Sequence, residues 1–333
     1  MTAEDGALAL AHEALRGKKF HEAEEHARRV LRRNPTCAPA ICVLGSALSN
    51  RGDDIEAMRL FRQAIACDGQ FAPAYYALSR RYYSTGLSDG AREMYRAWSR
   101  LEPSNPEVQH LAAAVTGENV PDRCSEAYVQ AHFNQFADSF DDVLVKGLGY
   151  RGPEAVSVAL SKYGSMTGPS MDVLDAGCGT GLCGVSVRPL CRSLVGVDLA
   201  ERMVERARTR GCYDELVVAD LCELMESRPN AFDAIVSSDV FIYFGALERG
   251  IASAHGALRQ GGLLVITVEA LHQGIEPYRL TASGRYAHRD SYLRTVISSA
   301  GFKLLSLEEE CLRWELDRET MFYTLVSKKT LAL

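Results

Sequence analysis

The segment that most restricts how this chain can fold reads VLDAGCGTG, from Val173 to Gly181. An apolar strand pattern ends there in Asp175 and is followed by three alternating glycines, Gly177, Gly179 and Gly181. Glycine has no side chain, so the backbone can turn sharply from a strand into a helix, and a ligand can approach the main chain. The pattern therefore predicts a cofactor-binding loop after the first strand of an α/β sheet.

The same glycines also fit the dinucleotide pattern GxGxxG, because residues 179–184 read GTGLCG. Asp175 separates the two interpretations. A carboxylate at the end of this strand would repel a pyrophosphate, whereas S-adenosylmethionine carries a sulfonium and an ammonium group and no phosphate. The acid therefore favours S-adenosylmethionine as the cofactor.

Acids recur at the ends of the apolar segments that follow. These segments are 193–199 (SLVGVDL) with Asp198, 215–221 (ELVVADL) with Asp220, and 232–240 (FDAIVSSDV) with Asp239. Asp198 stands about 20 residues after the loop, where an acid can accept hydrogen bonds from both ribose hydroxyls, and Asp220 is placed to accept from the adenine amino group. A fifth strand is predicted at 261–268 (GGLLVITV), after a Gly-Gly turn. Any one acid is equally well explained as a helix N-cap, but acids at successive strand ends favour a cofactor cleft.

From about residue 121 to the end, the chain resembles class I S-adenosylmethionine-dependent methyltransferases. Within that superfamily it is most similar to bacterial predicted methyltransferases with an N-terminal tetratricopeptide repeat domain. The motifs that carry the resemblance are FNQFADSFDDVLVKGLGYR (133–151), VLDAGCGTG (173–181), VGVDLA (195–200), DVFIYFGAL (239–247), ALRQGGLLVITVE (257–269) and SGRYAHRDSYL (283–293).

The resemblance implies a Rossmann-like, seven-stranded domain that binds S-adenosylmethionine. It also implies that Asp175 and the three glycines line the methionine end of the cofactor, that Asp198 holds the ribose, and that Asp220 with Leu221 flanks the adenine. Leu199, in the motif VGVDLA, and Asp239 complete the predicted set of cofactor-binding residues. The last two strands are expected at 302–314 and 320–328, as an antiparallel pair rich in β-branched and aromatic residues.

Residues 1–117 contain a 34-residue repeat, marked by Asn34-Pro35, Asp68-Gly69 and Glu102-Pro103. Small residues at the packing positions let paired helices approach, while an aromatic residue fills the gap between them. The pattern predicts a tetratricopeptide solenoid of three helix pairs, followed by a capping helix at 105–115. Such a solenoid can recruit a partner protein or a substrate, and it can equally serve as a rigid spacer or a self-association module.

Residues 118–150 are predicted to form a linker and a helical lid, and residues 151–333 the methyltransferase domain. In the lid, Tyr128, His132, Phe136 and Phe140 recur at every fourth residue and so share one helix face. In related methyltransferases this segment folds over the cofactor, which implies that Phe136 or Phe140 covers the sulfonium. Ordinary packing against the sheet is the alternative for each of these rings.

Composition predicts a cytoplasmic protein that binds neither nucleic acid nor membranes. The net charge is −6, and all of the acidic excess falls after residue 117. The basic run from Arg202 to Arg210 alternates with apolar residues, so we interpret it as a solvated helix face. No apolar stretch reaches the roughly 18 residues of a membrane span, and no basic N-terminal region precedes an apolar core. The 10 cysteines form no CxxC pair, so they predict reduced core residues and no metal site.

Methyl transfer is an in-line displacement, and a base is needed only when the acceptor must lose a proton. The acceptor is expected at the loops beyond the fourth and fifth strands. There, His288 is the first candidate for a base and Tyr243 the second candidate for a catalytic residue. Arg285 and Tyr286 are the candidate acceptor contacts, with Arg285 suited to an anionic group of a small molecule or peptide. The alternative function is a scaffold or regulator that binds the cofactor without turnover.

Overall fold

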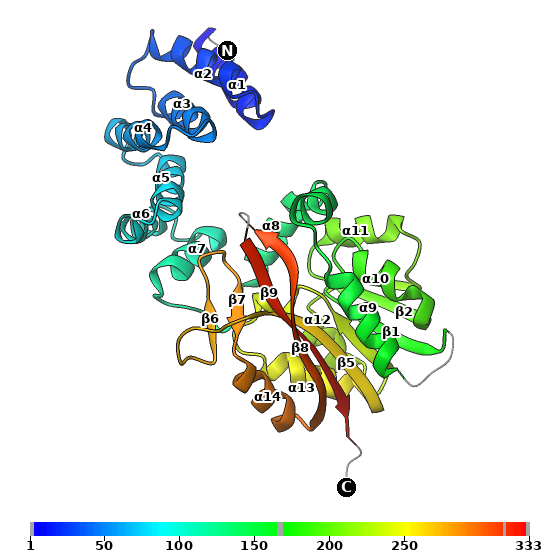
Figure 1. Cartoon of the computed structure of the whole chain (residues 1–333). Coiled ribbons are helices and arrows are strands. Elements are labelled where there is room, and N and C mark those ends of the chain that lie inside the picture. Colours follow the sequence, from blue (N-terminus) through cyan, green and yellow to red (C-terminus); the bar gives the residue numbers. More distant parts are fainter. Residues whose placement is uncertain (1–2, 165–168, 316–317, 331–333) are drawn as a thin grey trace. The chain divides into compact units, whose positions relative to one another are not determined.

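The computed structural model describes residues 3–164, 169–315 and 318–330 (Figure 1). The chain divides into two compact units, Met1–Asn119 and Val120–Leu333. Each unit has its own hydrophobic core. The segment from Val120 to Tyr150, which includes the predicted lid, belongs to the second unit. Among the described residues, no helix has the length and apolar character that crossing a bilayer requires.

The first unit is built from helices that each pack on the next along the chain. They are α1 (Ala3–Arg16), α2 (Phe20–Leu31), α3 (Ala38–Asn50), α4 (Asp54–Cys67), α5 (Ala72–Ser84), α6 (Ser88–Leu101) and α7 (Pro106–Thr116). The first six form the three predicted pairs, and α7 occupies the position of the predicted capping helix. Gly45 shows why small residues recur here, since a Cβ at this position would lie 2.7 Å from Cε1 of Phe61. The close approach of α3 and α4 therefore requires the glycine.

The second unit contains a mixed sheet with helices on both faces (Figure 1). Its strands are β1 (Met171–Ala176), β2 (Cys191–Asp198), β3 (Glu215–Val218), β4 (Phe232–Ser237), β5 (Leu258–Ala270), β6 (Tyr278–Leu280), β7 (Tyr286–His288), β8 (Phe302–Glu315) and β9 (Arg318–Lys329). Its helices are α8 (Glu126–Phe136), α9 (Gly152–Tyr163), α10 (Leu182–Val187), α11 (Glu201–Thr209), α12 (Leu221–Ser227), α13 (Glu248–Ala257) and α14 (Asp290–Ser299), with a π-helix η1 (Asp142–Gly147) and 3₁₀ turns η2 (Arg188–Leu190) and η3 (Phe241–Tyr243).

Seven strands reproduce the predicted Rossmann-like sheet. β3, β2, β1, β4 and β5 pair in parallel, and β9 then pairs antiparallel with both β5 and β8. Across the described residues the sheet nevertheless has nine strands, so the predicted count is corrected. The additional pair is the β6–β7 hairpin, which joins the end of β5. Glu269 pairs with Phe322 of β9 on one edge of β5 and with Ala287 of β7 on the other edge. The hairpin therefore pairs with the end of β5 that extends beyond its pairing with β4.

Both faces of the central strands are buried, because successive side chains of a strand point to opposite faces. In β1, Val173 belongs to one hydrophobic cluster and Leu174 to another. Neighbouring parallel strands share this pattern, which explains the continuous apolar runs in the sequence. The carboxyl ends of β1, β2 and β4 therefore lie together at one edge of the sheet, where the glycine loop begins.

Candidate functional site

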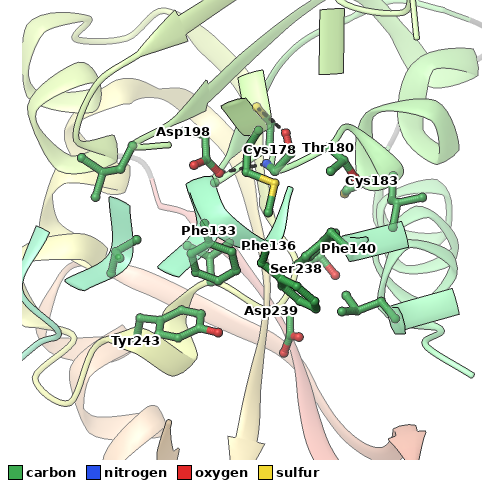
Figure 2. Close-up of a pocket in the computed structure, with 18 of the residues that line it drawn as sticks. Phe133, Phe136, Phe140, Cys178, Thr180, Cys183, Asp198, Ser238, Asp239 and Tyr243 are labelled. Atoms are coloured by element: carbon green, nitrogen blue, oxygen red, sulfur yellow. Dashed lines mark hydrogen bonds between the residues drawn. The ribbon is translucent and has the colours of Figure 1, made fainter. Parts of the chain in front are cut away.

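A cavity of about 290 Å³ lies at this edge of the sheet (Figure 2). Three parts of the second unit line it. The first is the glycine loop with the ends of β2 and β3, the second is the lid from α8 to η1, and the third is the group of residues after β4 together with side chains of the later strands. A single cavity thus joins the predicted cofactor cleft to the region where the acceptor is expected.

The glycine loop combines close packing on one side with open space on the other. Gly177 has a φ of 80°, and a Cβ there would lie 2.3 Å from Cγ2 of Val240. Gly179 has a φ of 52°, but no atom lies within 4 Å of its hypothetical Cβ. The loop is held in place because the amides of Gly177 and Cys178 both donate to the carbonyl of Val197, at 2.8 and 2.9 Å. Gly177 is therefore required by packing, and Gly179 leaves room for a ligand against the main chain.

The third glycine, Gly181, does not line the cavity. It is the residue before α10, with a φ of 90°, and its amide donates to the carbonyl of Cys178 at 2.9 Å. Its predicted contact with the cofactor is therefore corrected to a structural role in turning the chain into α10.

Asp198 lines the cavity beside the loop, and Leu199 lines it as well. The carboxylate of Asp198 accepts hydrogen bonds from the amides of Gly179 and Ala200, at 2.9 and 2.8 Å (Figure 2). Burial raises the pKa of this carboxyl, and the backbone donors oppose that rise. Asp198 therefore ties the loop to β2 and presents a hydrogen-bond acceptor at the position predicted for the ribose.

Asp175 does not line the cavity, which corrects its predicted position at the methionine end. Its side chain is wholly buried on the same face of β1 as Val173, against α10, because side chains alternate along a strand. There it accepts a hydrogen bond from the hydroxyl of Tyr213 at 2.7 Å. Burial raises the pKa of Asp175 to about 7. The acid that favoured S-adenosylmethionine in the sequence therefore lies beneath the loop, bonded to Tyr213.

Asp220 and Leu221 line the cavity, as the sequence predicts for the adenine end. One oxygen of Asp220 caps α12 by accepting from the amides of Cys222 and Glu223, at 3.0 and 3.1 Å. The other accepts from Nη2 of Arg123 at 2.7 Å. Both oxygens therefore already have partners in the protein. The sequence analysis did not identify Arg123, and its position before α8 gave no signal of this pairing.

The lid covers the cavity with aromatic rings. Figure 2 shows Phe133 between Asp198 and Tyr243, with Phe136 and Phe140 to one side of it, and all three rings line the cavity. Phe133 packs edge-on against Tyr243, with ring centroids 5.3 Å apart, and Phe136 packs edge-on against Phe140 at 5.4 Å. The rings make this part of the cavity apolar.

The basic run on α11 forms ion pairs with two carboxylates of the lid. Asp138 pairs with Arg202 at 2.6 Å and also with Arg206, while Asp141 pairs with Arg210 and accepts from the hydroxyl of Thr180 at 2.5 Å. The predicted solvated helix face is confirmed, because Arg202 and Arg206 remain about half exposed. The ion pairs were not predicted, because their carboxylate partners lie more than 60 residues earlier in the chain.

Beyond the aromatic rings, the cavity ends at a buried cluster of charged side chains. Arg313 pairs with Asp239, with Glu269 at 2.6 Å and with Glu315 at 2.7 Å. Arg285 pairs with Glu269 at 2.5 Å and with Glu315 at 2.6 Å. We call these five residues the charge cluster. All of them except Glu269 line the cavity. Arg313 and Glu315 were missed from the sequence, because residues 302–315 (FKLLSLEEECLRWE) carry several charged side chains and nothing marks these two as buried.

Asp239 belongs to this cluster and lies away from the ribose site. Figure 2 shows its carboxylate and the hydroxyl of Tyr243 on the opposite side of the cavity from Asp198. Its backbone has a φ of 63° and its amide donates to the hydroxyl of Thr267 at 2.8 Å. Its role in holding the cofactor stays a prediction, because Asp239 lines the same cavity as Asp198.

His288 and Tyr286 do not line the cavity, which corrects both predicted roles. His288 is wholly buried, with Nε2 3.1 Å from the carbonyl of Gly245 and its ring stacked on Tyr292. Tyr286 is also wholly buried and donates to the carbonyl of Pro121 at 2.5 Å. Alternation along β7 and the packing of the hairpin against the loop after β4 turn both side chains inward. They position the hairpin and lie out of reach of a ligand.

A structural role for His288 has a measurable consequence. Burial lowers its pKa to about 4, so the unfolded chain binds a proton at this site more tightly than the folded chain does. The stability contribution of neutral His288 is therefore complete above about pH 6.5 and falls by about 1.4 kcal/mol per pH unit as the pH drops toward 4. We expect a His288→Gln variant to lose less stability than the wild type between pH 6.5 and 4.5, in denaturant titrations.

The control for this experiment is His21→Gln, at an exposed position on α2. Cofactor affinity and labelling activity of the folded His288→Gln variant are expected to stay within a few-fold of the wild type. Lost labelling in a fully folded variant would restore His288 to the list of catalytic candidates.

Two family models match this chain in the places that the geometry indicates. Residues 174–266 match the model described as a methyltransferase domain, and residues 52–115 match a tetratricopeptide repeat model. The chain thus contains a class I S-adenosylmethionine-dependent methyltransferase domain. The match confirms the predicted family, with tetratricopeptide repeats before the methyltransferase domain and S-adenosylmethionine as the cosubstrate of that domain.

Curated relatives match the methyltransferase domain over short stretches. One is the biotin biosynthesis bifunctional protein BioHC of Saccharophagus degradans, 30% identical over 98 residues, which are 28% of this chain and 18% of that protein. Another is the mitochondrial ubiquinone biosynthesis O-methyltransferase of Rattus norvegicus, 32% identical over 104 residues, which are 29% of this chain and 30% of that protein. The chain therefore spans less than a third of the length of these relatives.

The solved structure of the [4+2]-cyclase SpnF is similar with a TM-score of 0.52 and 17% sequence identity, covering 64% of this chain and 98% of that one. This likeness concerns the fold of the methyltransferase domain alone. Because that structure is named as a cyclase, the fold by itself does not determine the reaction. The reaction must be inferred from the site.

Proposed function

We propose that this protein transfers a methyl group from S-adenosylmethionine to an oxygen, nitrogen or sulfur nucleophile of a small molecule or peptide. The observation that carries the proposal is the single cavity, which has the glycine loop and Asp198 at one end and Tyr243 with the charge cluster at the other. A cofactor and an acceptor can therefore meet under one lid. Bound S-adenosylmethionine would supply an electrophilic methyl group on a positively charged sulfur.

The residues of the cavity fit such a cofactor. Open space beside Gly179 admits a ligand against the main chain, and Asp198 offers a carboxylate for the ribose hydroxyls. The rings of Phe136 and Phe140, which line the cavity, favour a cation over an anion. The residues orient the reactants and exclude water, which is where most of the acceleration of a displacement reaction originates.

Binding and labelling together test the proposal. The purified chain is expected to bind S-adenosylmethionine and its demethylated product at micromolar concentrations and not to bind NAD, as measured by calorimetry. Incubation with methyl-labelled cofactor and a cell extract should then transfer label to an acceptor. Binding of NAD without binding of S-adenosylmethionine would contradict the proposal. Cofactor binding with no transfer would favour the scaffold or regulator instead.

For the repeat unit we propose recruitment of a protein partner or of the acceptor. The unit has its own core, and every residue that lines the cavity lies between Arg123 and Glu315. We therefore expect a chain that begins at Val120 to keep near-normal affinity for S-adenosylmethionine and activity on a small free acceptor, and to lose activity on a peptide or carrier-bound acceptor.

The matched comparison is a shorter chain that begins directly after Cys124. It lacks Arg123 and the residues that pair with the loop after β4, where the amides of Gly245 and Ala246 donate to the carbonyl of Asp122. This shorter chain should bind the cofactor poorly. If the chain from Val120 is insoluble or fails to bind the cofactor, the repeat unit is part of the catalytic core and the recruitment proposal is wrong.

A further inference from the structure

The charge cluster at the acceptor end has an excess of carboxylates. Three carboxylates, from Asp239, Glu269 and Glu315, face the two guanidinium groups of Arg285 and Arg313. Burial opposes ionisation of Glu315, but the guanidinium groups of Arg313 and Arg285 hold its pKa below the usual range. By formal charge the cluster therefore holds one more carboxylate than it holds guanidinium groups, and burial raises the pKa of one of those carboxyls, Glu269.

The carboxylates of the cluster are also more accessible than its most buried cation. The side chain of Arg313 is 3% exposed, whereas those of Asp239 and Glu315 are 13% and 27% exposed. Arg285, at 18%, donates from Nε and Nη2 to Glu269 and Glu315. An anionic acceptor would have to displace these carboxylates from the guanidinium groups while remaining beside them. The predicted use of Arg285 to fix an anion is therefore unfavourable.

The cluster lies next to the part of the cavity where the reacting methyl group is expected. Val240, the residue after Asp239, contacts the glycine loop so closely that a Cβ on Gly177 would lie 2.3 Å from it. The hydroxyl of Tyr243 lies on the same side of the cavity as Asp239 (Figure 2). A group bound beside Asp239 is thus close to the loop.

We propose that the methyl acceptor binds as a cation, through an ammonium group held by the carboxylates of Asp239 and Glu315, and that it is methylated on nitrogen. This inference rests on the proposed function and adds the class of acceptor. The aromatic walls support it, since the rings of Phe133, Phe136 and Tyr243 line the cavity and aromatic rings attract an ammonium group.

The proton and electron balance of the step follows from these groups. The ammonium gives one proton to a carboxylate of the cluster, which passes it to solvent. The lone pair of the freed amine forms the bond to the methyl carbon as the carbon–sulfur bond breaks, and that electron pair stays on sulfur. The products are a methylated ammonium and S-adenosylhomocysteine, with one proton released. No oxidant or further reactant is needed.

The experiment uses the full chain, methyl-tritiated S-adenosylmethionine, and a metabolite and peptide extract that ion exchange has first separated into cationic, neutral and anionic pools. We expect label in the cationic pool, in a form that resists alkaline hydrolysis. Label in the anionic or neutral pool, or its release by base as methanol from an ester, would overturn the inference and leave the proposed function standing. Absence of label from every pool would overturn the proposed function itself.

A charge-only variant tests the role of the cluster. Glu315→Gln keeps the shape of the side chain and removes its charge. We expect this variant to label the cationic pool with a kcat/KM about 10-fold lower, which corresponds to about 1.4 kcal/mol in transition-state binding. Its cofactor affinity should stay within two-fold of the wild type. The matched control is Glu308→Gln on the same strand, where the side chain is 62% exposed and pairs with Lys162. Equal labelling by wild type and Glu315→Gln would contradict the inference, and the pool experiment decides it if that variant fails to fold.

Discussion

An Asp198→Ala variant is expected to bind S-adenosylmethionine about 30-fold or more weakly than the wild type. Two hydrogen bonds from ribose hydroxyls to a charged acceptor contribute roughly 2 to 4 kcal/mol, which corresponds to that factor or a larger one. The substitution also removes the acceptor for the amides of Gly179 and Ala200, so the loop loses its tie to β2. Calorimetric titration with the cofactor and with its demethylated product measures the effect.

Two further variants separate ligand binding from loop support. Asp198→Asn keeps one acceptor oxygen and should fall between the wild type and Asp198→Ala. Asp89→Ala, at a fully exposed side chain on α6, should bind normally. Unchanged affinity of a folded Asp198→Ala variant would place the ribose elsewhere in the cavity.

Features that depend on neighbours in sequence were predictable. The 34-residue repeat specifies helix pairs because each unit packs mainly on the next one. The glycine loop was also predictable in outline, since positive φ angles at Gly177, Gly179 and Gly181 require glycine whatever surrounds them. The main strands were found because parallel strands buried on both faces give continuous apolar runs.

The direction of individual side chains was harder to predict. Asp175 ends the strand at the expected place, but the alternation of β1 turns its carboxyl under the loop toward Tyr213. His288 has the chemistry of a base, yet the short strand β7 turns it into the core. A one-residue difference in register decides between these positions, and β6 and β7 are only three residues long, which is too short for a clear pattern.

The charge cluster was missed because long-range strand pairing creates it. Asp239 follows β4, Glu269 ends β5, Arg285 precedes β7, and Arg313 lies on β8. β8 reaches the site only through its pairing with β9, which in turn pairs with β5. No spacing in the sequence reports this arrangement. The acids of the cofactor end, in contrast, follow consecutive parallel strands, so their order along the chain predicts their proximity.

The largest effect on stability is expected for Arg313→Met. The variant leaves Glu269 and Glu315 paired with Arg285 and removes the ion pair of Asp239. Removing one partner of a buried ion-pair network typically costs about 3 to 5 kcal/mol, since the remaining charges stay desolvated. Hydrogen exchange of the amides of β5, β8 and β9 in the full chain measures the loss in the second unit. Arg294→Met, which removes an exposed pair with Asp290, should cost well under about 1 kcal/mol.

The pH dependence distinguishes lost charge pairing from lost packing. In the wild type the guanidinium groups lower the folded-state pKa of Glu315, so its stabilising contribution is present at neutral pH and is lost as the pH falls through that value. In Arg313→Met the crowded carboxylates take up protons more readily, so the stability difference from wild type should narrow between pH 7 and pH 4. Adding Glu269→Gln, which removes one of the uncompensated charges, should recover part of the loss at pH 7. The opposite result would be a stability difference between wild type and Arg313→Met that stays constant with pH, with no recovery in the double variant. It would mean that Arg313 stabilises the sheet by packing its guanidinium over the ring of Phe322, 4.9 Å from the ring centroid. The excess of carboxylates would then contribute little to the free energy of unfolding.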